Sequence, residues 1–134
     1  MKLIVCLGDD GGMMFNHRRQ SRDRILVADI VRHVKNTPLW VSPYSAPLFE
    51  GDCPTLCTEI APVQSARMGD YCFVEDTPLP PTSSDIEEII IYRWNRLYPS
   101  DTYFTCDTSS FVLRESTEFT GSSHDKITKE VWTK

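Results

Sequence analysis

Apolar runs along the chain alternate with short stretches that favour turns. Residues 2–8 (KLIVCLG) form an apolar run that ends at GDDGG, so they predict a buried first strand followed by a turn. Residues 21–36 carry apolar side chains at helical spacing, with Ser21 placed to cap the helix. The helix is expected to end near Asn36, before Pro38. The chain therefore begins as a strand followed by a helix.

The middle of the chain predicts short elements. Residues 38–43 (PLWVSP) read as a second strand, and residues 45–50 (SAPLFE) offer a serine cap and an early proline, which favour a short helix. Residues 51–69 carry no clear pattern. Residues 70–76 (DYCFVED) predict a third strand, and residues 77–85 (TPLPPTSSD) a proline-rich connector.

The last third of the chain predicts mainly strands. Residues 86–94 (IEEIIIYRW) contain a continuous apolar run, which is typical of a central strand covered on both faces. The segments that follow, joined by polar turns, predict an antiparallel ending: residues 102–107, 111–119 and 126–132. The expected architecture is an α/β domain with a mixed sheet, spanning residues 1–134 as one domain.

Composition narrows the classes of function. A net charge of -5 over 134 residues argues against a dedicated nucleic-acid binder. Residues 1–40 nevertheless hold seven Lys and Arg against four Asp, which predicts a locally basic face. The first apolar run is too short for a signal sequence or a membrane span, so we expect a cytoplasmic protein with no membrane partner. Five cysteines, an odd number, predict reduced thiols, and CPTLC lacks the further ligands that a metal site needs.

Three segments resemble the dihydrofolate reductases. LIVCLGDDGGMMFN resembles that family's first strand and the active-site loop after it. IIIYRWNRLYPSDTYFTCD and FVLRESTEFTGSSHDKITKEVW resemble its central strand with the following turn and its last long hairpin. The resemblance implies a dihydrofolate reductase-like fold with a shortened middle region. The chain also resembles small bacterial proteins labelled ribonuclease Z, but that activity needs an H-x-H-x-D-H cluster that is absent here.

The cofactor side departs from the family pattern. Where these reductases place a glycine pair and a helix that cradle the cofactor pyrophosphate, this chain has VEDTPLPPTSSD. Glu75 and Asp76 would repel a pyrophosphate, and the prolines would break a helix. The turn that meets the 2′-phosphate of NADPH in the family reads SPYSAP here, without a cation. We therefore expect no NADPH and no other cofactor.

The substrate side retains one family feature and loses another. Asp23 matches the carboxylate that the family carries at the start of its first helix, so the resemblance makes it a candidate catalytic residue. The alternative is an acid that stabilises the helix dipole. The family's threonine position falls on Tyr92, whose bulk would intrude into a pterin pocket. Folate reduction is therefore not expected.

Two function classes follow for the stretch HRRQSRD. In the first, a cleft beside the first helix binds a small anionic or nucleotide-like ligand, with Arg18, Arg19 and Arg22 supplying charge and Asp23 and Tyr92 forming its floor. In the second, the domain is an interaction or regulatory module whose arginine-rich loop contacts a protein or an RNA backbone. An open pocket favours the first class, and a closed cleft with exposed arginines favours the second.

The resemblance also implies that the loop after the first strand is clasped from two sides. Asp101 is expected to accept hydrogen bonds from backbone N–H groups near residues 11–14. Ser123 or His124, in the turn of the last hairpin, is expected to contact the segment near residues 16–17. The cluster SSHD itself reads as a polar hairpin turn, because sequence neighbours do not form a catalytic triad.

Overall fold

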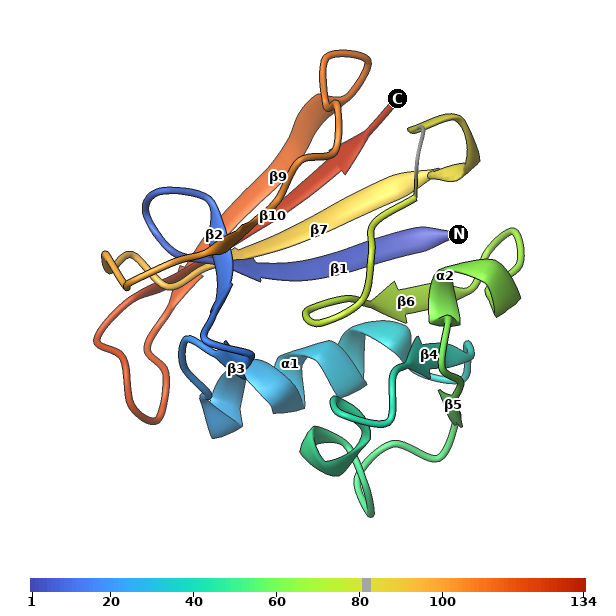
Figure 1. The fold of residues 1–134 in the computed structure, drawn as a ribbon, viewed down its shortest axis with the longest axis horizontal. Helices are drawn as coiled ribbons and strands as arrows, with labels where there is room; N and C mark the ends of the chain where they lie inside the picture. Colours follow the sequence, from blue (N-terminus) through green and yellow to red (C-terminus); the bar gives the residue numbers. More distant parts are fainter. Residues whose placement is uncertain (81–82) are drawn as a thin grey trace.

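A computed structural model describes residues 1–80 and 83–134, so part of the proline-rich connector predicted over 77–85 lies outside the described residues. Its main feature is a seven-stranded sheet (Figure 1). The strands lie side by side in the order β5 (Leu56–Thr58), β4 (Leu39–Val41), β6 (Tyr71–Phe73), β1 (Lys2–Leu7), β7 (Glu88–Arg93), β10 (Ile127–Thr133) and β9 (Val112–Phe119).

The sheet is mixed. Strand β1 pairs in parallel with β6 and β7, whereas β10 pairs antiparallel with both β7 and β9. Because β7 lies between β1 and β10, the prediction that residues 86–94 form a central strand is confirmed. The α/β fold with an antiparallel C-terminal hairpin is confirmed as well.

A second, small sheet was not predicted. It contains β3 (Arg18–Arg19), β2 (Gly12–Phe15) and β8 (Thr102–Tyr103). Asn16 and His17 form the turn between β2 and β3 with positive φ angles of 51° and 60°. The first half of HRRQSRD is thus a turn and a two-residue strand, because Arg18 and Arg19 pair with Phe15 and Met14.

Helix α1 (Arg24–Val34) covers one face of the sheet (Figure 1). Its buried residues Leu26, Ile30 and Val34 follow the predicted helical spacing. The N-cap is Asp23 and not Ser21, since Asp23 adopts extended backbone angles and its side chain accepts the first free N–H groups. The helix ends two residues before the predicted Asn36.

The remaining helical elements are short. They are the 3₁₀ turn η1 (Ala46–Leu48) in place of the predicted helix over 45–50, helix α2 (Pro62–Ser65) and the 3₁₀ turn η2 (Ser83–Asp85). The unassigned stretch 51–69 contains β5 and α2. Within the described residues, we find no helix with both the length and the apolar character that a membrane crossing requires.

The core consists of two apolar layers, one on each face of the sheet. Under α1, Ile4 of β1, Ile90 of β7 and Trp94 pack against Leu26 and Ile30. On the opposite face, alternate residues of the same strands pack together: Leu3, Val5, Ile89 and Ile91, with Met13 and Phe111. This alternation explains why β7 reads as a continuous apolar run.

Candidate functional site

The site begins with Asp23, which is 2% exposed and joins the start of α1 to the last hairpin. Its Oδ1 accepts the N–H groups of Ile25 at 3.0 Å and Leu26 at 3.1 Å. The N–H of Ser122 also donates to Oδ1, and that of Ser123 donates to Oδ2 at 2.9 Å. Burial alone would raise the pKa of Asp23, but the N–H groups of Ser123 and Ser122 outweigh it and hold the pKa well below its ordinary value.

His124 extends the same network into the core. Its Nδ1 lies 3.1 Å from Oδ2 of Asp23, and its Nε2 lies 3.0 Å from Oγ of Ser21 and 2.9 Å from the hydroxyl of Tyr98. The imidazole stacks on Trp94 with the ring centroids 4.5 Å apart. The contacts with Asp23 and Ser21 tie the β9–β10 turn to the start of α1, and those with Tyr98 and Trp94 tie it to the segment after β7. The oxygen atoms of Asp23, the candidate catalytic residue, thus accept hydrogen bonds from the chain itself.

Arg19 is held by an acid across the cleft. Its Nε donates to Oε1 of Glu75 at 3.1 Å and its second guanidinium nitrogen donates to Oε2 at 2.8 Å, which makes a two-point ion pair. Ser45 donates to Oε2 at 2.7 Å, and Tyr44 lies under the guanidinium, 4.6 Å from ring centroid to Cζ. We call this group the Arg19 latch. Sequence reasoning identified both charged residues but not their pairing.

The cleft behind the Arg19 latch is nearly filled by side chains. Its volume is about 20 Å³, far below the several hundred Å³ typical of small-molecule sites. The residues that fill it include Cys6, Ser21, Leu26, Phe73 and Trp94. Burial raises the pKa of the Cys6 thiol, so this thiol stays protonated. The predicted open pocket does not exist at this position in the described structure.

Tyr92 does not line this cleft. Its hydroxyl donates to Oδ2 of Asp29 at 2.5 Å, and Nζ of Lys129 lies 2.9 Å from the same oxygen. Burial, followed by the charge of Asp29, raises the pKa of Tyr92. The expected place of Tyr92 on the cleft floor is therefore corrected, because its side chain bridges the sheet to α1.

A wider groove runs along the exposed side of α1. Its volume is about 830 Å³, and its apolar lining comes from Val27, Ala28, Val31, Pro47 and Leu48. The charged and polar lining consists of Arg22, Arg24, Arg32, Glu50, Asp52, Ser122 and Ser123, with Asp23 at the end. Arg32 forms an ion pair with Asp29 at 2.7 Å. Within residues 1–80 and 83–134, the guanidinium groups of Arg22 and Arg24 have no hydrogen-bond or ion-pair partner, so they can receive an anion.

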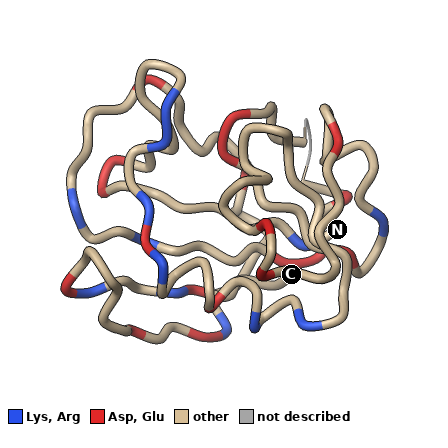
Figure 2. Tube along the Cα trace, turned by 90° about the horizontal axis from the view of Figure 1, so that it is seen from below, with Lys and Arg blue, Asp and Glu red and all other residues tan. Residues whose placement is uncertain are grey.

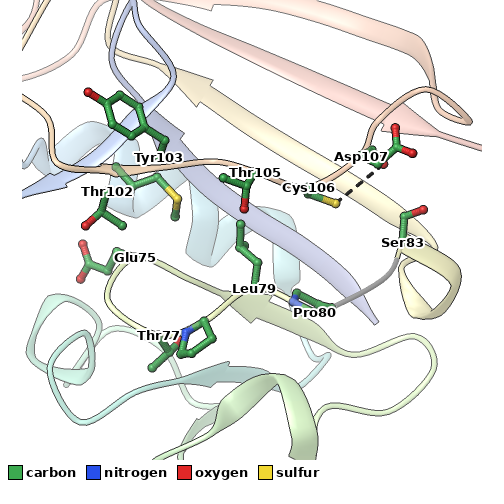
Figure 3. Close-up of a pocket in the computed structure, with 12 residues that line it drawn as sticks. Glu75, Thr77, Leu79, Pro80, Ser83, Thr102, Tyr103, Thr105, Cys106 and Asp107 are labelled. Carbon is green, nitrogen blue, oxygen red and sulfur yellow. Dashed lines mark hydrogen bonds between the residues drawn. The ribbon is translucent and has the colours of Figure 1, made fainter.

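A second cavity, of about 500 Å³, lies between the loop after β6 and the segment after β8 (Figure 3). Its labelled lining includes Glu75, Thr77 and Leu79 on one side and Tyr103, Cys106 and Asp107 on the other. Two acids and no Lys or Arg belong to the described lining. The cavity is therefore poorly suited to a phosphorylated ligand.

Basic residues do not collect on one side of the molecule in the view of Figure 2, where blue and red segments are interspersed along the chain. The locally basic face expected from residues 1–40 is not seen in that view. One physical reason is pairing, since Arg19 and Arg32 each form an ion pair with an acid. Attraction of an anion must then come from individual arginines, Arg22 and Arg24 above all.

The loop between β1 and β3 is held by Asp101 but not by Ser123 or His124. Oδ2 of Asp101 accepts the N–H of Asn16 at 2.9 Å, and the N–H of Asp101 donates to the carbonyl of Met14. The acceptor contact lies two residues beyond the range expected from sequence. Ser123 and His124 contact residues 21–23 rather than 16–17. Arg18 is exposed beside a shallow pocket with Phe15 and Tyr98.

Replacing Asp101 by alanine is expected to speed amide hydrogen exchange in residues 9–20 and nowhere else. The lost hydrogen bond is exposed, so the effect is about 0.5–1.5 kcal/mol, or roughly 2- to 10-fold in exchange rate. Asp107→Ala is the matched control, because Asp107 is an acid that caps a turn outside this loop. Unchanged protection in residues 9–20 would show that Asp101 does not hold the loop.

Replacing Arg19 by methionine is expected to lower the free energy of unfolding by about 2 kcal/mol, since Glu75 would lose its charged partner in a site that is 7% exposed. Urea denaturation measures the loss. The double variant Arg19→Met/Glu75→Gln should lose less than the sum of the single variants, because both charges are then gone. Lys126→Met breaks a surface ion pair and should cost less than about 1 kcal/mol. Equal losses for the two pairs would contradict a buried latch.

Comparison with known proteins bears on the fold. No protein-family model matches the chain, and no curated protein matches it. Among solved structures, it is similar to a dihydrofolate reductase from Enterococcus faecalis complexed with NADP(H) and RAB-propyl. The TM-score is 0.63 at 10% sequence identity, and the match covers 98% of this chain and 94% of that chain. This likeness shows a dihydrofolate reductase-like fold and, at that identity, the fold alone.

Proposed function

We propose that the protein binds a small organic anion with an apolar portion in the groove beside α1. The proposal rests on one groove of about 830 Å³. In it, two unpartnered guanidinium groups, those of Arg22 and Arg24, lie beside a strip of apolar side chains. This volume lies within the range of small-molecule sites. Arginine also matches carboxylate and phosphate oxygens two at a time.

The ligand is oriented by the arrangement of the lining. Arg22 and Arg24 stand at the end of the groove where α1 begins, beside the hydroxyls of Ser122 and Ser123. An anionic group bound there leaves the apolar portion over Val27 and the residues that follow it on the same face of α1. Aryl phosphates, aryl carboxylates and nucleoside monophosphates have this division into a charged and a flat apolar part.

The same proposal excludes NADPH-dependent folate reduction. A dinucleotide would need cations along the cavity of Figure 3, whose described lining holds Glu75 and Asp107 instead. A pterin would need the cleft behind the Arg19 latch, which has a volume of about 20 Å³. The contacts around Asp23 also argue against a proton-transfer role for that carboxylate, since its pKa lies below its ordinary value.

A thermal-shift screen tests the proposal with phenyl phosphate, nucleoside monophosphates, folate and NADPH. A ligand at 100 times its Kd adds about 2.7 kcal/mol of stability, which is roughly 10 °C for a chain of this length. We expect shifts with an aryl phosphate or a monophosphate and none with NADPH. Calorimetric binding of NADPH with a Kd of about 1 μM or lower would refute the proposal.

A charge-matched pair of variants locates the site. Arg22→Gln/Arg24→Gln removes the two unpartnered cations, and it should abolish the thermal shift without changing the melting temperature of the free protein by more than about 2 °C. Arg67→Gln removes an exposed cation that does not line the groove. An equal loss of the shift in Arg67→Gln would show that the anion binds by overall charge and not in the groove.

A further inference from the structure

The fold assembles a hydroxyl, an imidazole and a carboxylate in the order of a catalytic triad. Oγ of Ser21 lies 3.0 Å from Nε2 of His124, and Nδ1 of His124 lies 3.1 Å from Oδ2 of Asp23. Ser21 and Asp23 precede α1, whereas His124 comes from the turn between β9 and β10, about one hundred residues later. The polar cluster SSHD thus supplies one member of the triad, and the fold brings the other two to it.

The partners of His124 define its tautomer. The Asp23 carboxylate only accepts hydrogen bonds, so Nδ1 of His124 carries the proton and Nε2 presents its lone pair. Ser21 then donates its hydroxyl proton to Nε2. This is the arrangement in which an imidazole removes the proton of a serine as the oxygen attacks.

The imidazole and the carboxylate are rigidly placed. His124 is 4% exposed and stacks on Trp94, with an angle of 27° between the ring planes. Asp23 is oriented by backbone N–H groups from two elements, α1 and the last hairpin. Ser21, in contrast, is half-buried and lines the edge of the nearly filled cleft. The base and its orienting acid are therefore inside, and the hydroxyl is at the boundary.

We propose that Ser21 is a nucleophile that is acylated by carboxylic esters with a small acyl group, and that His124 is its general base. The cleft volume of about 20 Å³ beside Ser21 is close to that of a single water molecule, so only the smallest acyl groups are expected to react. The acylation of Ser21 does not depend on anion binding in the groove beside α1.

The reaction is written in two balanced halves. Oγ of Ser21 attacks the carbonyl carbon while its proton passes to Nε2 of His124; the bond to the alcohol oxygen then breaks, and this oxygen takes the proton. The product is an O-acyl serine. A water molecule next attacks the acyl carbon and gives a proton to Nε2, and the bond to Oγ breaks. Oγ recovers the proton, and the carboxylic acid leaves.

Two hydroxyls lie at Nε2 of His124, that of Ser21 at 3.0 Å and that of Tyr98 at 2.9 Å. Covalent labelling distinguishes a catalytic from a structural role, because a hydroxyl that only holds the network together forms no acyl adduct. Ser21→Ala removes the reaction while leaving the His124 to Asp23 contact in place.

The test uses the full chain with 4-nitrophenyl acetate and a fluorophosphonate probe. Mass spectrometry should find the adduct on the peptide that carries Ser21, and release of 4-nitrophenol should fall at least about 100-fold in Ser21→Ala and in His124→Gln. Ser110→Ala, at an exposed serine elsewhere, should keep the adduct. Circular dichroism establishes that Ser21→Ala is folded. No adduct on the wild-type protein, or an adduct that persists in folded Ser21→Ala, would overturn the proposal.

Discussion

Replacing Asp23 by alanine is expected to lower the free energy of unfolding by about 3–5 kcal/mol. The change removes the N-cap of α1 and leaves partly buried donors of the last hairpin, the N–H groups of Ser122 and Ser123, without their acceptor. The carboxylate is tightly enclosed, because a β-carbon on Gly121 would clash with its Oδ2. Urea denaturation followed by tryptophan fluorescence measures the loss.

The pH dependence of stability gives the control for this prediction. The pKa of Asp23 is lower in the folded protein than the ordinary value of about 3.9, so its stabilising contribution is present above that value. The contribution is lost as the pH falls below about 3.9 toward the folded pKa. Asp23→Asn should lack this part of the acid dependence and be less stable at pH 7. A midpoint at pH 7 equal to that of the wild type would contradict the anchoring role.

Replacing Trp94 by alanine is expected to cost a similar 3–5 kcal/mol. Trp94 directly follows β7, is 5% exposed, and packs against both the core under α1 and the ring of His124. Truncating it opens a cavity among residues that other strands hold in place. Thermal denaturation followed by circular dichroism gives the change in Tm, with Trp94→Phe as the milder control.

Trp132 offers a matched comparison for Trp94. It lies on β10 and is only partly buried, against the opposite core layer, so Trp132→Ala should cost less than Trp94→Ala. Because both variants replace a tryptophan by alanine, the difference between their losses of stability reflects burial and not residue type. A near-neutral Tm for Trp94→Ala would place this side chain outside the core.

Elements with a strong local pattern could be predicted from the sequence. The apolar runs of β1 and β7, and the helical spacing of Leu26 and Ile30, depend on burial in the sheet and under α1. The short strands β2 and β3 could not be predicted, and only the first two residues of the strand expected over 102–107 form β8, since these strands exist because distant segments pair, such as Gly12 with Tyr103. The same holds for the N-cap: Ser21 and Asp23 are both good caps, and contacts with the last hairpin select Asp23.

The candidate site could be predicted only as a set of residues. Charge in HRRQSRD indicated an anion site, and Arg22 does line the groove beside α1. The ion pair of Arg19 with Glu75 joins residues 56 positions apart, and nothing local to either residue reveals it. Tyr92 was expected in the cleft by alignment with a threonine of the family. Instead, its hydroxyl donates to Asp29 of α1, and Lys129 lies over its ring. Tertiary pairing decides which charges stay available to a ligand.

A titration of ¹⁵N-labelled protein with phenyl phosphate, followed by NMR, tests the central claim that the groove beside α1 binds a small organic anion. The account predicts saturable shifts of the backbone signals of Arg22, Arg24, Val27 and Ser122, and their loss in Arg22→Gln/Arg24→Gln. Shifts confined to residues 102–107 beside the cavity of Figure 3, or no saturable shifts at all, would contradict it.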